Sequence, residues 1–335
     1  MQNHVQRRNL MLGAVGATLM VPVLPTWAQT ATISHTQIFP KPGTTLKYIV
    51  PFAPGGLTDV MARIVGQKLG DAWKVPVIIE NKAGGNAQIG AELVAKGISD
   101  GSQLLAITLT HVANVSLFPN AAYSFVKDLR PVALLASSPM LIVVPINSPI
   151  KDFKDLIALS KTKQLNAGSS GNGTPPHLTM AMFNDLNKSK MTHVPYKGGT
   201  PSMVDLIGGQ LDVVFSNFPE SIAHVKGGKL RALAICSLGR HPQVPDVPTT
   251  MEAGMPGLFV ENWTAAMVQA STPDAIVEKY SREMIKIMFS SDVEERAKQQ
   301  GFRILPKGTD DFSRFLKSEI DRWSRLIKVA NIKAT

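Results

Sequence analysis

The chain of 335 residues is long enough for two domains that each bury a core. Its residues are 44% hydrophobic and 18% charged, which is typical of a folded protein and excludes a largely disordered one. The formal net charge is +10, but the lysines and arginines are scattered, with no run of five and no aromatic-and-basic motif, so nucleic acid is the weakest candidate partner.

The N-terminus has the features of an export signal. Arg7 and Arg8 precede an apolar stretch at residues 10–24, and Thr26-Trp27-Ala28 offers a cleavage site. We therefore expect residues 1–28 to be a signal peptide and the polar residues 29–44 to be a tether. The paired arginines suit twin-arginine export, and they suit an ordinary secretory leader as well.

The first predicted domain repeats strand, loop and helix. Expected strands lie at residues 46–50, 75–80 and 103–107, and expected helices at residues 57–69 and 89–96. The pairs Gly55-Gly56 and Gly84-Gly85 supply loops between them. This order predicts a parallel sheet with helices on its faces.

Residues 131–145 form a long apolar stretch that is rich in proline and β-branched side chains. The stretch is too long for one ordinary strand, and its prolines oppose a helix, so we expect two strands leading into a second domain. The earlier pattern resumes there, with expected strands at residues 165–168, 192–195, 211–215 and 230–235 and expected helices at residues 176–186 and 201–207.

A second apolar stretch, residues 259–269, is expected to return the chain to the first domain. Helices are expected after it at residues 273–289, 293–300 and 311–330. The last has an apolar stripe that predicts packing on the parent sheet rather than on a membrane; the stripe comprises Phe312, Phe315, Leu316, Ile320, Trp323, Leu326 and Ile327.

The predicted fold class is therefore α/β, with two lobes joined by two crossover strands. We expect one lobe at residues 45–140 and 261–335 and the other at residues 141–260. Ligands of open parallel sheets bind beyond the carboxyl ends of the strands, so the pattern predicts a ligand cleft between the lobes.

Metal, cofactor and nucleophilic chemistry have little support. The seven histidines show no H-E-x-x-H spacing, and the single cysteine, Cys236, excludes an internal disulfide and suits a buried core position. The chain has no phosphate-binding G-x-x-x-x-G-K-[ST] motif, no dinucleotide G-x-G-x-x-G motif at a strand end and no G-x-S-x-G elbow. We therefore expect no cofactor, no metal and no catalytic residue.

With metal, cofactor and nucleophilic chemistry set aside, the remaining candidate site is a set of small polar loops, which suit ligand binding. The amides of Gly55 and Gly56 at a helix start favour an anion such as a carboxylate. Thr174 is either a helix cap or a ligand donor, and His177 either faces the cleft or packs. Asp59 suits a helix N-terminus, but it repels an anion unless a ligand amine or a water lies between.

The chain as a whole resembles the Bug-type, or tripartite tricarboxylate transporter, family of extracytoplasmic solute receptors. Seven motifs in the family's order carry this resemblance: Pro51 to Gly56 with Asp59, Ala62 and Arg63; Glu80-Asn81 with Ile89 to Glu92; Ser170 to Thr174 with His177-Leu178; His193 to Gly198; Asp205-Leu206 with Gly208 to Gln210; Gly228 to Ala234; and Pro245 to Thr249 with Glu252 to Gly254.

The resemblance implies a periplasmic binding protein of type II that closes on a small carboxylate, held by loop amides and ordered water. With the hydroxyls and the amide noted from the residues themselves, the expected ligand-binding set is Ala53, Gly55, Gly56, Asp59, Thr110, Ser169, Ser170, Thr174, His177 and Asn217. The chain departs from the family at Asn86, Ala87 and Gln88, and at Ser216, where the family often has Asp.

The leading hypothesis is a soluble, monomeric periplasmic receptor that delivers its carboxylate to the membrane component of a tripartite transporter. An exported hydrolase or isomerase on the same scaffold is the alternative, and it requires an activated base such as His177 near Ser170. A ligand sensor that signals through a partner protein is the third hypothesis.

Overall fold

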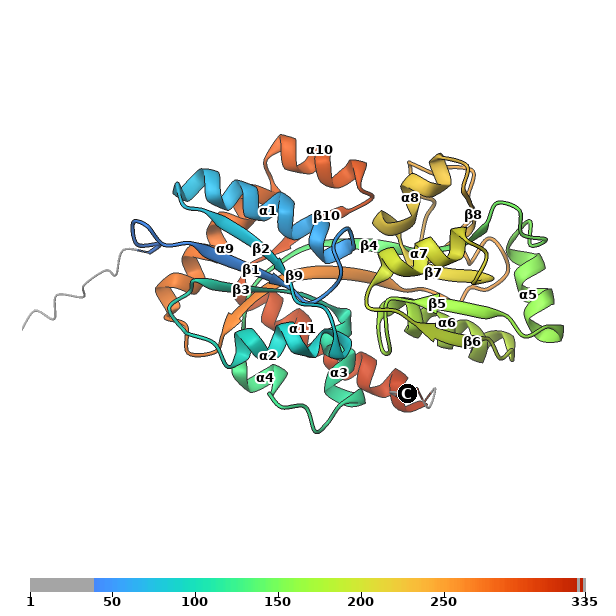
Figure 1. Ribbon diagram of the computed structural model, residues 1–335, viewed down its shortest axis with the longest axis horizontal. Coiled ribbons are helices and arrows are strands. Elements are labelled where there is room, and N and C mark those ends of the chain that lie inside the picture. The colour runs from blue at the N-terminus through green and yellow to red at the C-terminus, as the bar shows by residue number, and fades with distance from the viewer. Residues whose placement is uncertain (1–38, 330–331, 334–335) are drawn as a thin grey trace, which may run out of the picture. The chain divides into compact units, whose positions relative to one another are not determined.

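A computed structural model describes residues 39–329 and 332–333 of the chain (Figure 1). The predicted signal peptide and all but the last six residues of the predicted tether lie outside the described residues. In the described part, the strands follow the order β2-β1-β3-β9-β4-β7-β5-β6, with β8 and β10 also paired to β4.

The first half of this order is built on β1 (Leu46–Val50), a buried apolar strand that pairs in parallel with two neighbours. These neighbours are β2 (Val77–Asn81) and β3 (Gln103–Thr108), and α1 (Leu57–Trp73) and α2 (Gln88–Ala95) make the connections. Parallel strands need such crossovers, which place the end of each strand beside the start of a helix at one edge of the sheet.

The second half repeats this arrangement around β5 (Asn166–Ser169). Its parallel neighbours are β6 (Thr192–Pro195) and β7 (Val213–Asn217), and α6 (Pro175–Asn187) and α7 (Gly199–Ile207) are the connecting helices (Figure 1). The strand ends and helix starts of this half therefore also gather at one edge.

One long strand, β4 (Leu129–Pro145), belongs to both halves. It pairs with β9 (Glu261–Gln269) as far as Pro139, and from Met140 onward it pairs with β7 and β8 (Leu230–Ile235). The prediction of two strands at residues 131–145 was therefore wrong. The chain tolerates its prolines because Pro131 lies beside a register shift and Pro139 at the exchange of partners, where a missing N–H breaks no regular ladder.

The other elements not predicted from the sequence are α3 (Leu109–Leu117), α4 (Phe125–Asp128), α5 (Phe153–Thr162), α8 (Phe218–Lys226), β10 (Arg303–Lys307) and a short 3-10 turn at Gly85–Ala87. Both α3 and α8 begin at the residue after a strand ends, so no glycine- or proline-containing loop separates strand from helix. The boundaries of the two proposed lobes stay a prediction.

The C-terminal part contains α9 (Asp274–Met288), α10 (Ser291–Gln299) and α11 (Thr309–Val329). The stripe on α11 packs as predicted, because Phe312 and Trp323 are buried in the core. The indole N–H groups of Trp263 and Trp323 both donate to Glu319, at 3.0 and 3.2 Å, which anchors the helix. None of the helices in the described residues is long and apolar enough to cross a membrane.

Leu134 provides a test of how the shared strand is stabilised. It is fully buried in β4 beside β9, so Leu134→Ala should lower the free energy of unfolding by about 2–5 kcal/mol through lost burial and a new cavity. Leu238→Ala is the matched control, since Leu238 is 77% exposed, and it should change stability by less than about 0.5 kcal/mol. Urea unfolding measures both, and equal losses would contradict the role assigned to β4.

Candidate functional site

Five helices begin around one small pocket, which we name the helix-start pocket. Its lining residues are Phe52, Gly56, Leu57, Thr58, Thr108, Thr110, Ser170, Thr174, Pro175, Pro176, Gly199, Asn217, Glu220 and Asn262. The residues that cap α1, α3, α6 and α8 are themselves in this set, namely Gly56, Thr108, Thr174 and Asn217. Because each helix start carries unpaired N–H groups and partial positive charge, the five together favour an anion.

The start of α1 is shaped by its two glycines. Gly55 has a φ of +79°, which favours glycine, and its N–H donates to Asp59 Oδ2 at 2.9 Å. Gly56 is the N-cap residue, with an extended backbone and no side chain to cap the helix. The first backbone donors of α1 therefore face the pocket without competition from a local side chain.

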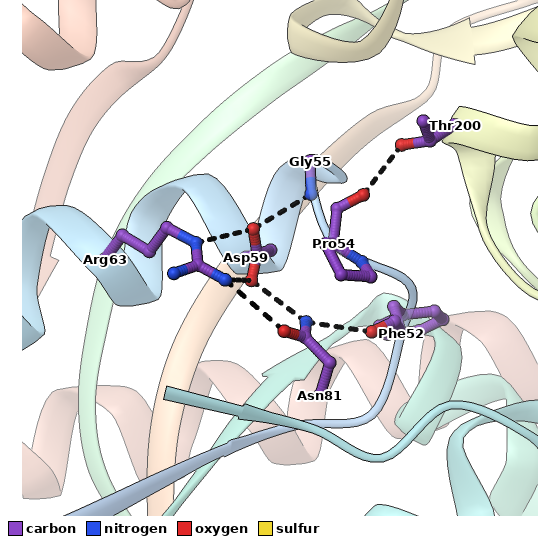
Figure 2. A network of polar contacts seen from close by, with 7 residues as sticks. All are labelled: Phe52, Pro54, Gly55, Asp59, Arg63, Asn81 and Thr200. Carbon is purple, nitrogen blue, oxygen red and sulfur yellow. Dashed lines mark hydrogen bonds and ion pairs between the residues drawn. The ribbon is translucent and has the colours of Figure 1, made fainter. Parts of the chain in front are cut away.

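Asp59 holds this loop in place from below (Figure 2). Besides the Gly55 N–H, its carboxylate accepts hydrogen bonds from Arg63 and from Asn81 Nδ2, all at 2.9 Å, and Asn81 also donates to the carbonyl of Phe52. Burial alone would raise the pKa of Asp59, but the hydrogen bonds from Arg63, Gly55 and Asn81 hold it below its ordinary value. The charge of Asp59 is thus neutralised by Arg63.

On α3, Thr108 caps the helix by accepting a hydrogen bond from the Thr110 N–H at 3.1 Å. The hydroxyl of Thr110 is fully buried and has no hydrogen-bond partner among the described residues. Leaving a buried hydroxyl unpaired costs free energy, so such a group in a pocket lining indicates a ligand or water partner.

The loop at residues 169–174 supplies a second hydroxyl of the same kind. Ser170 is only 8% exposed, lines the pocket, and its Oγ also has no partner among the described residues. Thr174 is the N-cap residue of α6, but its hydroxyl donates to the carbonyl of Gly171 at 2.6 Å instead of capping the helix. The first two helical residues are Pro175 and Pro176, which have no N–H, so α6 offers fewer donors than α1.

His177 and Ser169 support this loop from the side away from the pocket lining. His177 Nδ1 accepts the Gly173 N–H at 2.9 Å, and its ring stacks on His193 at 3.9 Å between centroids. Burial lowers the pKa of His177 to about 4 and that of His193 to about 3, so both rings are neutral at pH 7. Ser169 Oγ lies 2.6 Å from His193 Nε2 and also binds the backbone of Gly171.

The starts of α7 and α8 complete the pocket. They also add Glu220, a residue that was not predicted from the sequence to belong to the site. Asn217 is the N-cap residue of α8, and instead of capping the helix its side-chain Nδ2 donates to Glu220 Oε1 at 2.9 Å. Glu220 Oε1 also accepts the Leu57 N–H of α1 at 3.4 Å. An available signal was the order Asn217-Phe218-Pro219-Glu220, in which a capping residue, an early proline and a first-turn acid mark a helix start.

Contacts between loops of the two halves surround the pocket. Thr200 Oγ1 donates to the carbonyl of Pro54 at 2.9 Å (Figure 2), and Ala53 N–H donates to the carbonyl of Lys197 at 3.4 Å. Asn262 of β9 donates to Asn217 Oδ1 at 2.8 Å. The remaining cavity is about 20 Å³, little more than the space of one water molecule.

Of the ten residues expected from the sequence to bind ligand, the structure brings five together in the pocket lining: Gly56, Thr110, Ser170, Thr174 and Asn217. The other five, Ala53, Gly55, Asp59, Ser169 and His177, lie outside the lining, and each is hydrogen-bonded to the loops that form it. Groups of histidine, cysteine, aspartate and glutamate that could hold a metal ion do not occur in the described residues. Cys236 is fully buried, as predicted.

Residues 61–332 match the sequence model described as Tripartite tricarboxylate transporter family receptor. The chain belongs to this family. BugT of Bordetella pertussis is 32% identical to it over 296 residues, covering 87% of this chain and 91% of BugT. The family resemblance that the seven motifs predicted is thus confirmed.

Solved structures of receptors in this group share the fold. The periplasmic binding protein BugD has 28% identity and a TM-score of 0.84, covering 88% of this chain and 99% of BugD. MatC from Rhodopseudomonas palustris, solved with bound malate, has 32% identity and a TM-score of 0.80, covering 86% of this chain and all of MatC. The fold is therefore that of periplasmic binding proteins, and the family is one of solute-binding receptors.

Asp59 offers a test of how the pocket is supported. Asp59→Asn should lower the free energy of unfolding at pH 7 by about 1–3 kcal/mol, because it removes the charge that binds Arg63 in a partly buried network. The folded-state pKa lies below the ordinary value of 3.8, so the advantage of the wild-type protein is present above this pH and is lost as the pH falls further.

Asp185→Asn is the matched control, because Asp185 forms an exposed pair with Lys188 and should change stability by less than about 0.5 kcal/mol. Urea unfolding of the three proteins at several pH values gives the comparison. A loss for Asp59→Asn that does not shrink in acid would show that its charge is not what stabilises the loop.

Proposed function

We propose that this receptor binds a small organic carboxylate in the helix-start pocket. The observation that carries the proposal is the meeting of five helix starts with two buried, unpartnered hydroxyls, Thr110 and Ser170. A carboxylate accepts several hydrogen bonds at once, and it is favoured by the partial positive charge at helix N-termini. Among the described residues, the pocket lining contains no arginine, lysine or histidine. Backbone N–H groups and hydroxyls would therefore bind the carboxylate.

Expected ligand donors are the first amides of α1, the two unpartnered hydroxyls and the amide of Asn217. Gly55 and Asp59 would act indirectly, since their mutual hydrogen bond fixes the loop that presents Gly56. His177 and Ser169 would do the same for the loop of Ser170. Because the cavity of about 20 Å³ is too small for a dicarboxylate, the ligand would enter as the loops around Thr200 and Pro54 separate.

The family supports the wider role. MatC carries malate in its structure, and BugD is a periplasmic binding protein, so a periplasmic receptor for a carboxylate follows by similarity. We propose that the chain reaches the periplasm through the signal peptide at residues 1–28 and delivers its ligand to the membrane component of a tripartite transporter. Export by the twin-arginine route is part of the same proposal and rests on Arg7 and Arg8 alone.

A binding role without catalysis fits the side chains. The hydrolase hypothesis requires His177 as a base for Ser170, but His177 Nδ1 accepts the Gly173 N–H and its ring stacks on His193. His193 contacts Ser169, whose side chain is 1% exposed and outside the pocket lining. We therefore propose that the chain is a receptor and not an enzyme.

Thr110→Val tests the pocket directly. Valine keeps the shape of threonine but removes a hydroxyl that has no partner, so the free energy of unfolding should stay the same or rise. Binding of the carboxylate should weaken about 10- to 100-fold, which is the value of one hydrogen bond to a charged group. Calorimetry on the mature protein, after a thermal-shift screen of di- and tricarboxylates, aromatic acids and amino acids, measures the affinity.

Thr179→Val is the control, because the Thr179 hydroxyl is equally buried but donates to the Pro175 carbonyl at 2.6 Å and lies outside the pocket lining. This change should cost about 1 kcal/mol of stability and leave the affinity unchanged. If no acid in the panel raises the melting temperature of the wild-type protein, the proposed function fails. If Thr110→Val binds as tightly as wild type, the carboxylate binds elsewhere.

A further inference from the structure

Glu220 is the only charged side chain in the pocket lining of the described residues. Its Oε1 accepts hydrogen bonds from Asn217 Nδ2 at 2.9 Å and from the Leu57 N–H at 3.4 Å. Its Oε2 packs against Gly199, where an added Cβ atom would come within 1.9 Å of that oxygen. The carboxylate is thus held at a defined position by the starts of α8, α1 and α7.

The negative charge of Glu220 has no counter-ion among the described residues. The arginine of α1, Arg63, already binds Asp59, and the partners of Glu220 are neutral amides. Burial raises the pKa of the Glu220 carboxyl to about 7, although the hydrogen bonds from Asn217 and Leu57 act in the opposite direction. A partly buried carboxylate in this situation gains most from a cation that reaches it.

A simple dicarboxylate supplies no such cation. Bound in this pocket, it would place two further negative charges beside Glu220, with no lysine or arginine in the described lining to balance them. Leu57, Thr110 and Ser170 line the same pocket, so the Leu57 N–H and the two unpartnered hydroxyls would donate to one carboxylate of the ligand once the pocket opens. A second group of the ligand then lies next to Glu220.

We propose that this second group is a cationic nitrogen, so that the receptor selects a ligand with both a carboxylate and an ammonium group, and that Glu220 is the residue that sets this specificity. The inference rests on the proposed function and names the ligand class for the same pocket. In the complex, Glu220 accepts from the ammonium group, and the Leu57 N–H that now donates to Glu220 becomes a donor to the ligand's carboxylate. The hydrogen bond between the ammonium group and Glu220 joins two charged groups, whereas the Leu57 N–H exchanges one carboxylate acceptor for another.

Matched pairs of small acids test the proposal. Calorimetry at about pH 7.5 compares 4-aminobutyrate with glutarate and 3-aminopropionate with succinate, since each pair differs by exchange of one carboxylate for an ammonium group. An aromatic pair, 4-(aminomethyl)benzoate and benzene-1,4-dicarboxylate, extends the comparison to larger ligands. In at least one pair, the amino acid should bind at least 10-fold more tightly than the diacid.

Two variants separate the charge of Glu220 from its position. Glu220→Gln keeps the size but removes the charge, and it should weaken the amino acid at least 10-fold while leaving the diacid unchanged or tighter. Gly199→Ala keeps the charge but displaces the carboxylate, and it should also weaken the amino acid. Glu278→Gln on α9 is the control, because Glu278 forms an exposed pair with Arg282, and it should bind both acids as wild type does.

Binding as a function of pH gives an independent readout with opposite signs for the two ligand classes. Glu220 must be ionised to bind an ammonium group, so affinity for the amino acid should rise between about pH 6 and pH 8. Affinity for a diacid that required protonated Glu220 would fall over the same window.

The same pH series on Glu220→Gln separates the titration of Glu220 from that of neighbouring groups such as His224 on α8 and His241, which packs against Phe218. Further ionisable groups lie nearby. On the starts of the surrounding helices and the loop before α7, they are Asp59 and Arg63, which bind each other, Lys197, His111 and His177. Burial lowers the pKa values of both histidines to about 4, so these rings stay neutral throughout. The carboxylate and ammonium groups of the amino acids, with pKa values of about 4 and about 10, keep their charges as well.

The outcomes distinguish the inference from the proposed function. If diacids bind at least as tightly as their amino-acid partners in every pair, or if Glu220→Gln binds amino acids as wild type does, the inference is overturned while the carboxylate receptor stands. An affinity for the amino acid that falls from pH 6 to pH 8 also overturns it. If no acid of either kind binds, both proposals fail together.

Discussion

The unpaired N–H groups at the helix starts are the constraint on which the site depends. A helix that begins at a sheet edge leaves several backbone donors without partners, and the buried edge of a sheet cannot leave them unsatisfied. Thr108 resolves this for α3 with its own hydroxyl, and prolines remove two donors from α6. At α1, Gly56 has no side chain, and the Leu57 N–H is met only by Glu220 from another helix. The helix-start N–H groups that no local side chain caps are therefore the positions where an anion would bind.

Much of the fold was predictable from the sequence, because the spacing of hydrophobic residues and the residue types of turns are local signals. The strands β1, β6 and β8 begin and end as predicted, since each is a short apolar or β-branched run with a glycine or proline near at least one end. The single strand β4 was not predictable in this way, because partner exchange at Pro139 depends on residues of β7 and β9 that lie 71 to 140 positions away. Helix α3 was not predictable either, because its first residue directly follows a strand. Helix α8 also follows a strand directly, although Asn217, Pro219 and Glu220 mark its start.

The site was predicted in part, for a related physical reason. Motifs located the loops, and five of the ten expected residues line the pocket. Which groups of a loop face the ligand depends on hydrogen bonds inside it, and these turned Gly55 and Asp59 toward each other rather than toward the pocket. Ser216 stands where the family often has Asp, and that departure removes one carboxylate near the cleft. Glu220, four residues further along in the first turn of α8, brings another to the pocket.

The position of β9 between β3 and β4 affects how the protein is made. A chain that has been synthesised only as far as Pro145 contains β1 to β4, yet β3 and β4 lack their shared neighbour until residues 261–269 emerge. Pairing over such sequence separation slows folding, because the loop-closure entropy is lost before the contacts form. The sheet that carries α1 is therefore among the last parts to be completed. During synthesis, the open edges of β3 and β4 must be kept from pairing with other chains.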